Sequence, residues 1–172
     1  IDLRHLGGNG IQFGRVRFLE AMQSQPERGL ASIGRHPKHI IDLAVDGDVE
    51  SLGRAIADSS SGHFFVMHPA SQTARVALED GSWLDIVPLP LGLEADLKRR
   101  DFTVNAMAVS VPGHRFVDPY GGLLDLALKV LRTPGLPSDS FGDDPLRMLR
   151  AARFSSQLGF AVADEVVDAM RS

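Results

Sequence analysis

The stretch from residue 40 to residue 87 limits the possible folds of this chain most strongly. It opens with Ile-Ile-Asp-Leu-Ala-Val at 40–45, a short apolar run that predicts a buried strand. Asp46-Gly47-Asp48 then turns the chain into a helix predicted over 49–58, with Asp48 placed to cap its first turn. One face of that helix is apolar and carries Val49, Leu52 and Ile56.

Hairpins follow this strand and helix. Runs rich in β-branched and aromatic residues predict three strands, at 63–67, 73–78 and 83–87, the last two joined as a hairpin through residues 79–82. A further strand at 106–111 is expected to pair with residues 115–117. A strand, a helix and then a set of hairpins predict an α+β fold with a mixed antiparallel sheet and helices on one side.

The two ends of the chain differ from this middle part. Residues 1–38 are punctuated by glycine and proline and predict loops around one short helix near 16–22. Near the other end, a Pro-rich segment at 133–137 precedes apolar residues at helical spacing. We therefore expect a head domain over 1–132, atypical over 1–38, and the beginning of a truncated helical domain over 133–172. The latter is expected to end before it buries a core of its own.

Composition excludes several classes of protein. Cysteine is absent, which rules out disulfides and thiolate metal sites, so a metal would need carboxylate or histidine ligands. The formal net charge of -4 argues against coating nucleic acid through bulk charge, although a local basic groove remains compatible with it. No apolar run approaches the ~18 residues of a membrane span, and nothing resembles a signal peptide. We expect a cytoplasmic protein and make no prediction of its oligomeric state.

Two acids stand in predicted strands, where a carboxylate is costly unless it is paired or binds a metal. They are Asp42 in the 40–45 strand and Asp85 in the 83–87 strand. A hydrogen bond to backbone or an ion pair with arginine is the purely structural alternative. The literal Asp-x-Asp at Asp46 and Asp48 lies beyond the strand, where capping the next helix explains it better.

The second half of the chain sets basic residues beside acids. Lys98-Arg99-Arg100 precedes Asp101, and arginine can grip phosphate oxygens with two parallel hydrogen bonds. Asp144 and Arg147 are three residues apart, a spacing that predicts one side of a helix, and Arg150 continues a basic stripe. A carboxylate and an arginine together match the pairing edges of cytosine and adenine. Taken alone, these charges would more often be solvated or paired with each other.

Three segments, 96–108, 118–132 and 141–160, resemble the class II tRNA nucleotidyltransferase (CCA-adding enzyme) and bacterial poly(A) polymerase family. They occur in the family's order, and the resemblance covers roughly residues 38–160. It implies a polymerase-β-like nucleotidyltransferase head followed by the start of an all-helical neck. It also implies Mg²⁺ as cofactor, CTP and ATP as substrates, and attack of a tRNA 3′-hydroxyl with release of pyrophosphate.

The resemblance also implies roles for particular residues. Asp42 and Asp85 would be the catalytic metal ligands. The nucleotide would be bound by six residues: Arg100, Asp101, Asn105, Asp144, Arg147 and Arg150. Within that set Asp144 and Arg147 would select the base in place of a template, and Arg150 would contact the triphosphate or the RNA end.

The chain departs from the family pattern at two places. Ile40 stands where the family has the first acid of its Asp-x-Asp, and residues 25–30 lack the family's Gly-Gly and Arg-Asp signature. Two functions therefore stay open: an enzyme that adds C, A or both to a tRNA 3′ end, and a catalytically impaired homologue or fragment that only binds nucleotide or RNA. The motifs do not distinguish CCA, CC, A or poly(A) addition.

Overall fold

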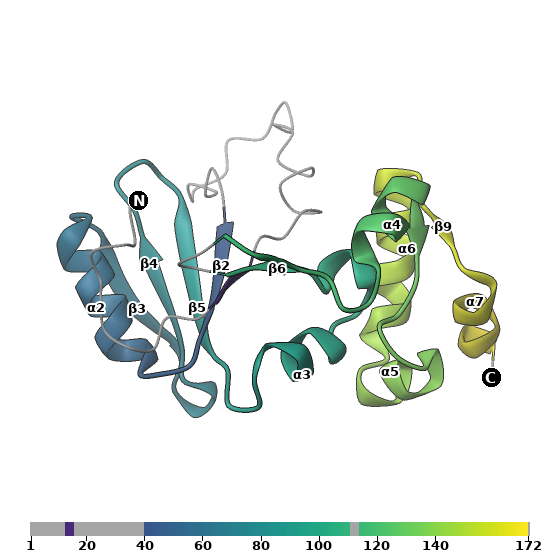
Figure 1. The fold of residues 1–172 in the computed structure, drawn as a ribbon, viewed down its shortest axis with the longest axis horizontal. Helices are drawn as coiled ribbons and strands as arrows, with labels where there is room; N and C mark the ends of the chain where they lie inside the picture. Colours follow the sequence, from purple (N-terminus) through teal and green to yellow (C-terminus); the bar gives the residue numbers. More distant parts are fainter. Residues whose placement is uncertain (1–12, 16–39, 111–113, 172) are drawn as a thin grey trace. The chain divides into compact units, whose positions relative to one another are not determined.

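The computed structural model describes residues 13–15, 40–110 and 114–171 (Figure 1). The loops and short helix predicted within 1–38 therefore lie outside the described residues, apart from 13–15. Contacts divide the chain into two units, Ile1–Gly92 with Ala108–Phe116, and Leu93–Met107 with Val117–Ser172. In the described part of the chain, no helix is both long and apolar enough to cross a membrane.

The first unit is built on a mixed sheet of seven strands in the order β3-β4-β5-β2-β1-β6-β7 (Figure 1). The strands are β1 (Phe13–Arg15), β2 (Ile40–Val45), β3 (His63–His68), β4 (Thr73–Ala77), β5 (Trp83–Pro88), β6 (Ala108–Val109) and β7 (Phe116–Val117). β2 and β5 are parallel, whereas β3–β4, β4–β5, β1–β2 and β1–β6 are antiparallel. The predicted strands from 40 to 87 are confirmed, and the one predicted at 106–111 is shorter.

Helix α2 (Val49–Ser59) covers one face of this sheet. Asp48 caps it as predicted, because its carboxylate accepts a hydrogen bond from the Glu50 amide. Gly53 lets the helix approach β3, since a Cβ there would lie 2.5 Å from the Phe64 ring. The core beneath the helix consists of Leu43, Val45, Val49, Ile56, Ala57, Ala74, Val76, Leu84 and Ile86. The α+β prediction is confirmed.

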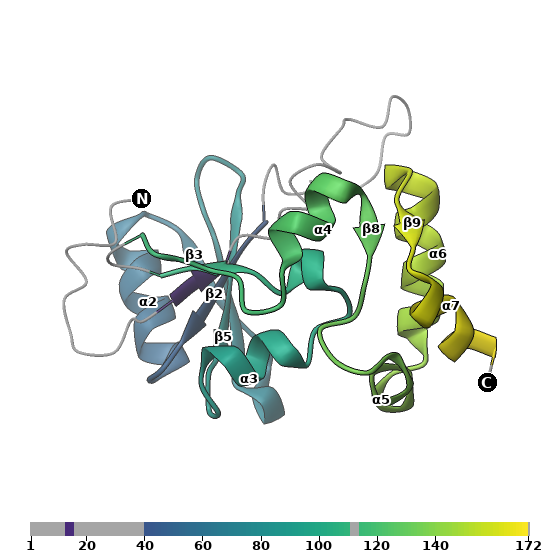
Figure 2. The same ribbon diagram turned by 45° about the vertical axis from the view of Figure 1, so that its right-hand side comes forward.

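The second unit is mainly helical. Its helices are α3 (Leu93–Lys98), α4 (Gly122–Leu128), α5 (Pro137–Asp143), α6 (Leu146–Leu158) and α7 (Asp164–Arg171). Two short strands, β8 (Val130–Leu131) and β9 (Ala161–Val162), lie side by side in parallel (Figure 2). Gly159 ends α6 with a φ of +67°, a conformation that glycine adopts without strain. The helical pattern after residue 145 is therefore two helices.

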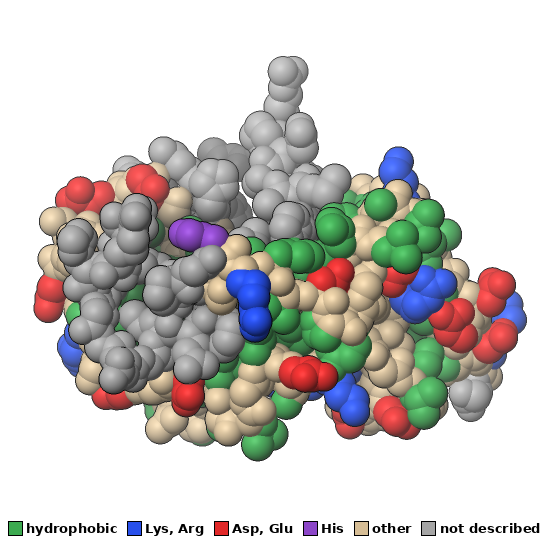
Figure 3. All heavy atoms as spheres, in the orientation of Figure 1, with side chains coloured by type: hydrophobic (Ala, Val, Ile, Leu, Met, Phe, Trp, Pro, Cys, Tyr) green, Lys and Arg blue, Asp and Glu red, His purple; other side chains and the backbone are tan. Residues whose placement is uncertain are grey.

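A small hydrophobic cluster stabilises this unit. Phe141, Ala163 and Val166 are buried together, and Val130 and Met148 pack against them. The expectation that residues 133–172 bury no core of their own stays a prediction, because this cluster also takes in Val130 of β8. Hydrophobic side chains also gather at the surface over α4, where Leu123, Leu124 and Leu128 are all more than half exposed (Figure 3).

The predicted domain boundary at residue 132 stays a prediction. The contacts of the chain group residues 93–107 with the helices that follow. One reason is Phe102, which is fully buried and meets Phe154 of α6 edge to face, with ring centroids 5.9 Å apart.

Candidate functional site

The structure brings the two predicted strand acids together. Asp42 of β2 and Asp85 of β5 are paired residues of the two parallel strands. Paired side chains point to the same face of a sheet, and here that face is the one away from α2, because their neighbours Leu43 and Ile86 lie in the core beneath the helix. Asp42 is only 4% exposed. Two carboxylates therefore stand next to each other on the face of the sheet away from α2.

Arg75 lies in line with these two acids, so the three charged residues form a row across β4, β5 and β2. It lies on β4 opposite Asp85, and its Nε and Nη2 donate to Asp85 Oδ1 and Oδ2 at 2.5 and 2.8 Å. These hydrogen bonds raise the pKa of Arg75, and the charges of Asp85 and Asp42 add to the effect while partial burial opposes it. The guanidinium also stacks on Trp83, with its Cζ 4.2 Å from the ring centroid. Sequence reasoning missed Arg75.

In the literal Asp-x-Asp, the second acid, Asp48, caps the start of α2. The Asp48 carboxylate accepts from the Ser51 hydroxyl at 2.5 Å and from the Glu50 amide at 3.0 Å. The Ser51 bond, followed by the Glu50 bond, lowers the pKa of Asp48. Asp46 is exposed to solvent. The prediction that these acids turn and cap the chain is confirmed for Asp48.

The two strand acids fit one magnesium ion better than a pair of ions. Mg²⁺ is commonly held by one or two carboxylates together with substrate phosphates. Asp42 and Asp85 supply that number from one face of the sheet. Ile40, two residues before Asp42 on the same face, adds no ligand, and the described residues contain no group of three or more His, Asp or Glu suited to a metal.

In the second unit, three of the predicted nucleotide-binding residues form one network around a buried carboxylate. Asp101 Oδ1 accepts from the Phe102 amide and from Asn105 Nδ2, at 2.8 and 3.0 Å. Its Oδ2 accepts from Arg150 Nε and lies 2.6 Å from Arg150 Nη2. The Arg150 guanidinium also stacks against the Phe154 ring, 5.2 Å from its centroid. Asp101 therefore fixes the positions of Asn105 and Arg150.

The basic run before Asp101 has a partner in α3, the helix that ends at Lys98. Asp96 of α3 is 4% exposed and accepts from Arg99 through Oδ1 and from Arg100 through Oδ2. Burial alone would raise the pKa of Asp96, but the charges and hydrogen bonds of Arg100 and Arg99 outweigh it and lower the pKa. Sequence reasoning missed Asp96, although its spacing of three and four residues from these arginines is that of helical ion pairs.

The predicted shared helix face of Asp144 and Arg147 is wrong. Helix α5 ends at Asp143 and α6 begins at Leu146, and Asp144 between them is extended, with φ −152° and ψ 98°. The cause is Pro145, since proline disfavours the helical conformation of the residue before it. The Asp144 carboxylate accepts from the Leu146 amide at 3.0 Å.

Arg147 is held within the same unit. Its Nη1 donates to the Ser140 hydroxyl and carbonyl at 2.8 and 3.2 Å, and its Nη2 donates to the Arg99 carbonyl at 2.8 Å. The side chain therefore ties the start of α6 to α5 and to the basic run. Arg147 and Arg99 share this hydrogen bond even though 48 positions separate them in the sequence.

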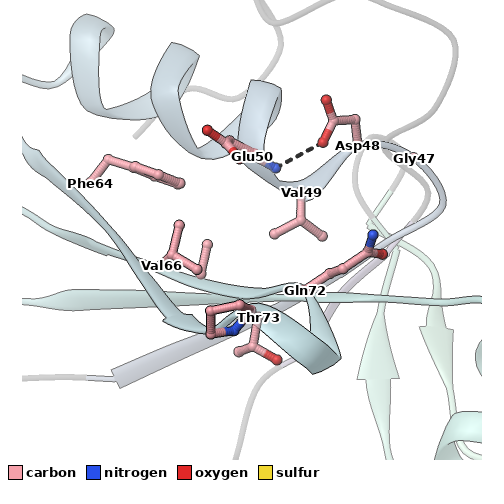
Figure 4. A pocket seen from close by; sticks show the side chains of 10 residues that line it. Gly47, Asp48, Val49, Glu50, Phe64, Val66, Gln72 and Thr73 are labelled. Atoms are coloured by element: carbon pink, nitrogen blue, oxygen red, sulfur yellow. Dashed lines mark hydrogen bonds between the residues drawn. The ribbon is translucent and has the colours of Figure 1, made fainter.

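A pocket of about 720 Å³ opens on the other face of the sheet, between the start of α2 and the β3–β4 connection (Figure 4). Phe64, Val49 and Val66 give it an apolar wall, and Asp48 and Glu50 stand at the start of the helix. None of the predicted site residues is among the described residues that line it. We therefore place the candidate site on the face that carries Asp42 and Asp85.

Comparison with known proteins gives consistent relatives. The poly A polymerase head domain family matches residues 89–132. A CC-adding tRNA nucleotidyltransferase of Geobacter sulfurreducens is 41% identical over 128 residues, which cover 73% of this chain and 29% of that protein. A CCA-adding enzyme of Bacillus subtilis is 54% identical over 78 residues, covering 45% of this chain and 19% of that enzyme. The chain thus spans less than a third of the length of these two relatives.

Solved structures agree with the sequence matches. A Thermotoga maritima CCA-adding enzyme complexed with tRNA superposes with a TM-score of 0.77 and 27% identity, over 98% of this chain and 38% of that chain. A tRNA nucleotidyltransferase complexed with a primer tRNA and an incoming ATP analog gives 0.76 and 26%, over 98% of this chain and 47% of that chain. In sequence and in fold, the chain belongs to the family of class II CCA-adding tRNA nucleotidyltransferases and poly(A) polymerase head domains.

Proposed function

We propose that this chain is the nucleotide-transferring part of a template-independent RNA nucleotidyltransferase, which adds C, A or both from CTP and ATP to a tRNA 3′ end. The observation that carries the proposal is the pair of acids, Asp42 and Asp85, directly opposite each other on adjacent parallel strands. Relatives named as CC-adding and CCA-adding enzymes support it. Related structures that contain tRNA, CTP or an ATP analog support it further.

Asp42 and Asp85 would hold Mg²⁺, which when bound neutralises triphosphate charge and makes the attacking hydroxyl more acidic. The acids themselves need fixed positions for this task. Both stand on paired residues in the interior of the sheet, between β4 and β1, so the backbone ladder fixes where their side chains begin. Carboxylates held on two adjacent strands lose little conformational freedom when they bind a metal ion.

The Asp101 network would hold the nucleotide. Asp101 fixes Asn105 and Arg150, and a guanidinium held in this way presents its remaining N–H groups to phosphate or ribose oxygens at low entropic cost. Arg99 and Arg100 carry two positive charges against the one negative charge of Asp96, so together they add local positive potential to this unit.

Asp144 and Arg147 would select the base, and the structure suggests how to test this without unfolding the helix. The Asp144→Asn variant keeps the oxygen that accepts from the Leu146 amide but replaces the second acceptor with a donor. A site that recognises the amino group of cytosine or adenine should then weaken its binding of CTP and ATP by roughly tenfold or more, while metal binding is unchanged. Fluorescent nucleotide titration measures this. The exposed neighbour Asp143, changed to asparagine, is the matched control, and equal nucleotide affinities in the two variants would remove Asp144 from base selection.

A second function is favoured by one specific feature, the isoleucine at position 40. Two-metal transfer needs more carboxylates than Asp42 and Asp85 supply, and the described residues around them contain no third acid. On this reading the chain is a catalytically impaired homologue that binds nucleotide or RNA without transferring it.

The Ile40→Asp variant distinguishes the two functions. Residues two apart in a strand point to the same face, so an aspartate at 40 stands beside Asp42 and opposite Trp83. We expect this variant to extend a tRNA that lacks its 3′ end at least about tenfold faster than wild type, with Mg²⁺ and labelled CTP or ATP, because the site gains a metal ligand. Ile41→Asp is the control, since it adds the same charge to the other face.

If Ile40→Asp gives no extension while nucleotide still binds, the binding-module function is the correct one. Extension by Ile41→Asp to the same degree would show that the gain comes from charge in general. That result would contradict the register assigned to Asp42.

A further inference from the structure

The candidate metal face contains a permanent cation. Arg75, Asp85 and Asp42 occupy one row across β4, β5 and β2. Arg75 uses two nitrogens to hold both oxygens of Asp85, and both side chains are only about one-fifth exposed. A guanidinium bound in this forked manner is a strong, oriented ion pair. The positive charge therefore occupies both oxygens of one of the two acids that would share a divalent cation.

This arrangement sets Arg75 and a metal in competition. A dication and a guanidinium repel each other strongly when both lie within a few ångströms of a partly buried carboxylate, because solvent screens them poorly. Trp83 offers the displaced guanidinium a place to remain, since the arginine already stacks on this ring. Arg75 can thus release Asp85 and stay on the same face of the sheet.

We propose that Arg75 is a positioning residue that holds Asp85 when no metal is bound, must release it before a divalent cation binds, and so sets the affinity of this face for metal. The inference rests on the proposed function, because it takes Asp42 and Asp85 as the metal ligands. It goes beyond that function by adding a residue that regulates when they are available. A purely structural role for Arg75 would leave metal affinity unchanged.

The test is a terbium titration, with Tb³⁺ as an oxygen-seeking substitute for Mg²⁺ and Trp83, the single tryptophan of the chain, as the sensitising donor. Arg75→Gln removes the charge but keeps a side chain that can hydrogen-bond Asp85. We expect it to bind Tb³⁺ roughly tenfold more tightly than wild type. Arg75→Lys keeps a charge that cannot fork across two oxygens, and we expect an affinity between the other two.

Arg54 supplies a matched control within the same unit. It also pairs with a carboxylate, Glu50, and stacks on an aromatic ring, Phe64, at 4.7 Å. It differs in lying on α2, and its ion pair is more than half exposed. Arg54→Gln should leave the Tb³⁺ affinity at the wild-type value, and Asp42→Asn should abolish the tight binding created by Arg75→Gln.

Unchanged or weaker Tb³⁺ binding by both Arg75 variants, with circular dichroism showing a wild-type fold for either one, overturns the proposal. Tight binding that survives Asp42→Asn overturns it as well, since the ion then lies elsewhere. The titration contains no nucleotide and no tRNA, so it is separate from the extension assay. Wild-type extension with no gain in Arg75→Gln refutes only the role of Arg75. A gain without any extension refutes only the transfer reaction.

Discussion

Asp42→Asn is expected to lower the rate of tRNA 3′ extension by at least about 100-fold, because it removes a charged ligand from a site that has few. The substitution changes the size of the side chain little, so the buried position at the centre of the sheet remains filled. The measurement is incorporation of labelled CTP or ATP into tRNA that lacks its 3′ end. It is made in the wild-type chain or in the Ile40→Asp variant, whichever is more active.

Asp46→Asn is the control for this prediction. Asp46 belongs to the literal Asp-x-Asp of the sequence but is exposed and lies after β2, so its loss should leave extension unchanged. An equal loss of activity in both variants would show that the acid pair has been placed in the wrong register. Full activity of Asp42→Asn would end the assignment of Asp42 as a catalytic ligand.

Gly122→Ala is expected to destabilise the helical unit by about 2–4 kcal/mol, at or above the usual cost of overpacking. A Cβ at this position would lie 2.1 Å from the Thr103 carbonyl oxygen and 2.8 Å from Met107 Cγ. The backbone at Thr103 cannot easily move away. Its amide donates to the Arg132 carbonyl at 2.7 Å, and its hydroxyl donates to Asp125 at 2.7 Å. Urea unfolding monitored by circular dichroism measures the loss.

Gly142→Ala provides the comparison for this stability prediction. Gly142 lies in α5 with no atom within 4 Å of an added Cβ, so alanine should be neutral or stabilising by a few tenths of a kcal/mol to about 1 kcal/mol. If both glycine variants unfold at the wild-type urea concentration, the close approach of α4 to Thr103 does not exist in solution.

Much of the sheet unit could be predicted because its elements are locally determined. The strand at 40–45 is apolar at every position except Asp42, the helix after it has one apolar face, and Asp48 has the side chain that a helix start requires. These signals act over a few residues, and the structure confirms each of them. The roles of Asp42 and Asp85 in metal binding stay predictions, although their placement side by side agrees with those roles.

Arg75 was missed because its partner depends on the register of a hairpin. The sequence predicts a four-residue loop over 79–82, a register that would pair Leu78 with Trp83. In the structure Ser82 closes the turn instead, with the Leu78 amide donating to its carbonyl, and Gly81 has a φ of +85°. A shift of one residue moves every side chain to the opposite face. The sequence names the residues of the turn but not its type, so it leaves the Arg75–Asp85 pair undetermined.

In the helical unit the prediction failed for a different reason: the residue spacing suggested one continuous helix where the structure has two. The spacing of Asp144 and Arg147 suited a helix, but Pro145 forces the chain to leave one helix and begin another. The role of Asp96 was not predicted, because the burial of a carboxylate depends on tertiary packing that no local sequence pattern reveals. The nucleotide-binding roles of Arg100, Asp101, Asn105, Arg147 and Arg150 stay predictions.

Arg75 also bears on whether this protein can fold before it binds a metal. In a zinc finger, the ion that balances the ligands is also the one that allows the chain to fold. Here a side chain of the sheet itself already balances one of the adjacent carboxylates. Assembly of the sheet therefore does not have to wait for a metal, and binding of a metal at the proposed site would be a separate, later step that substrate could accompany.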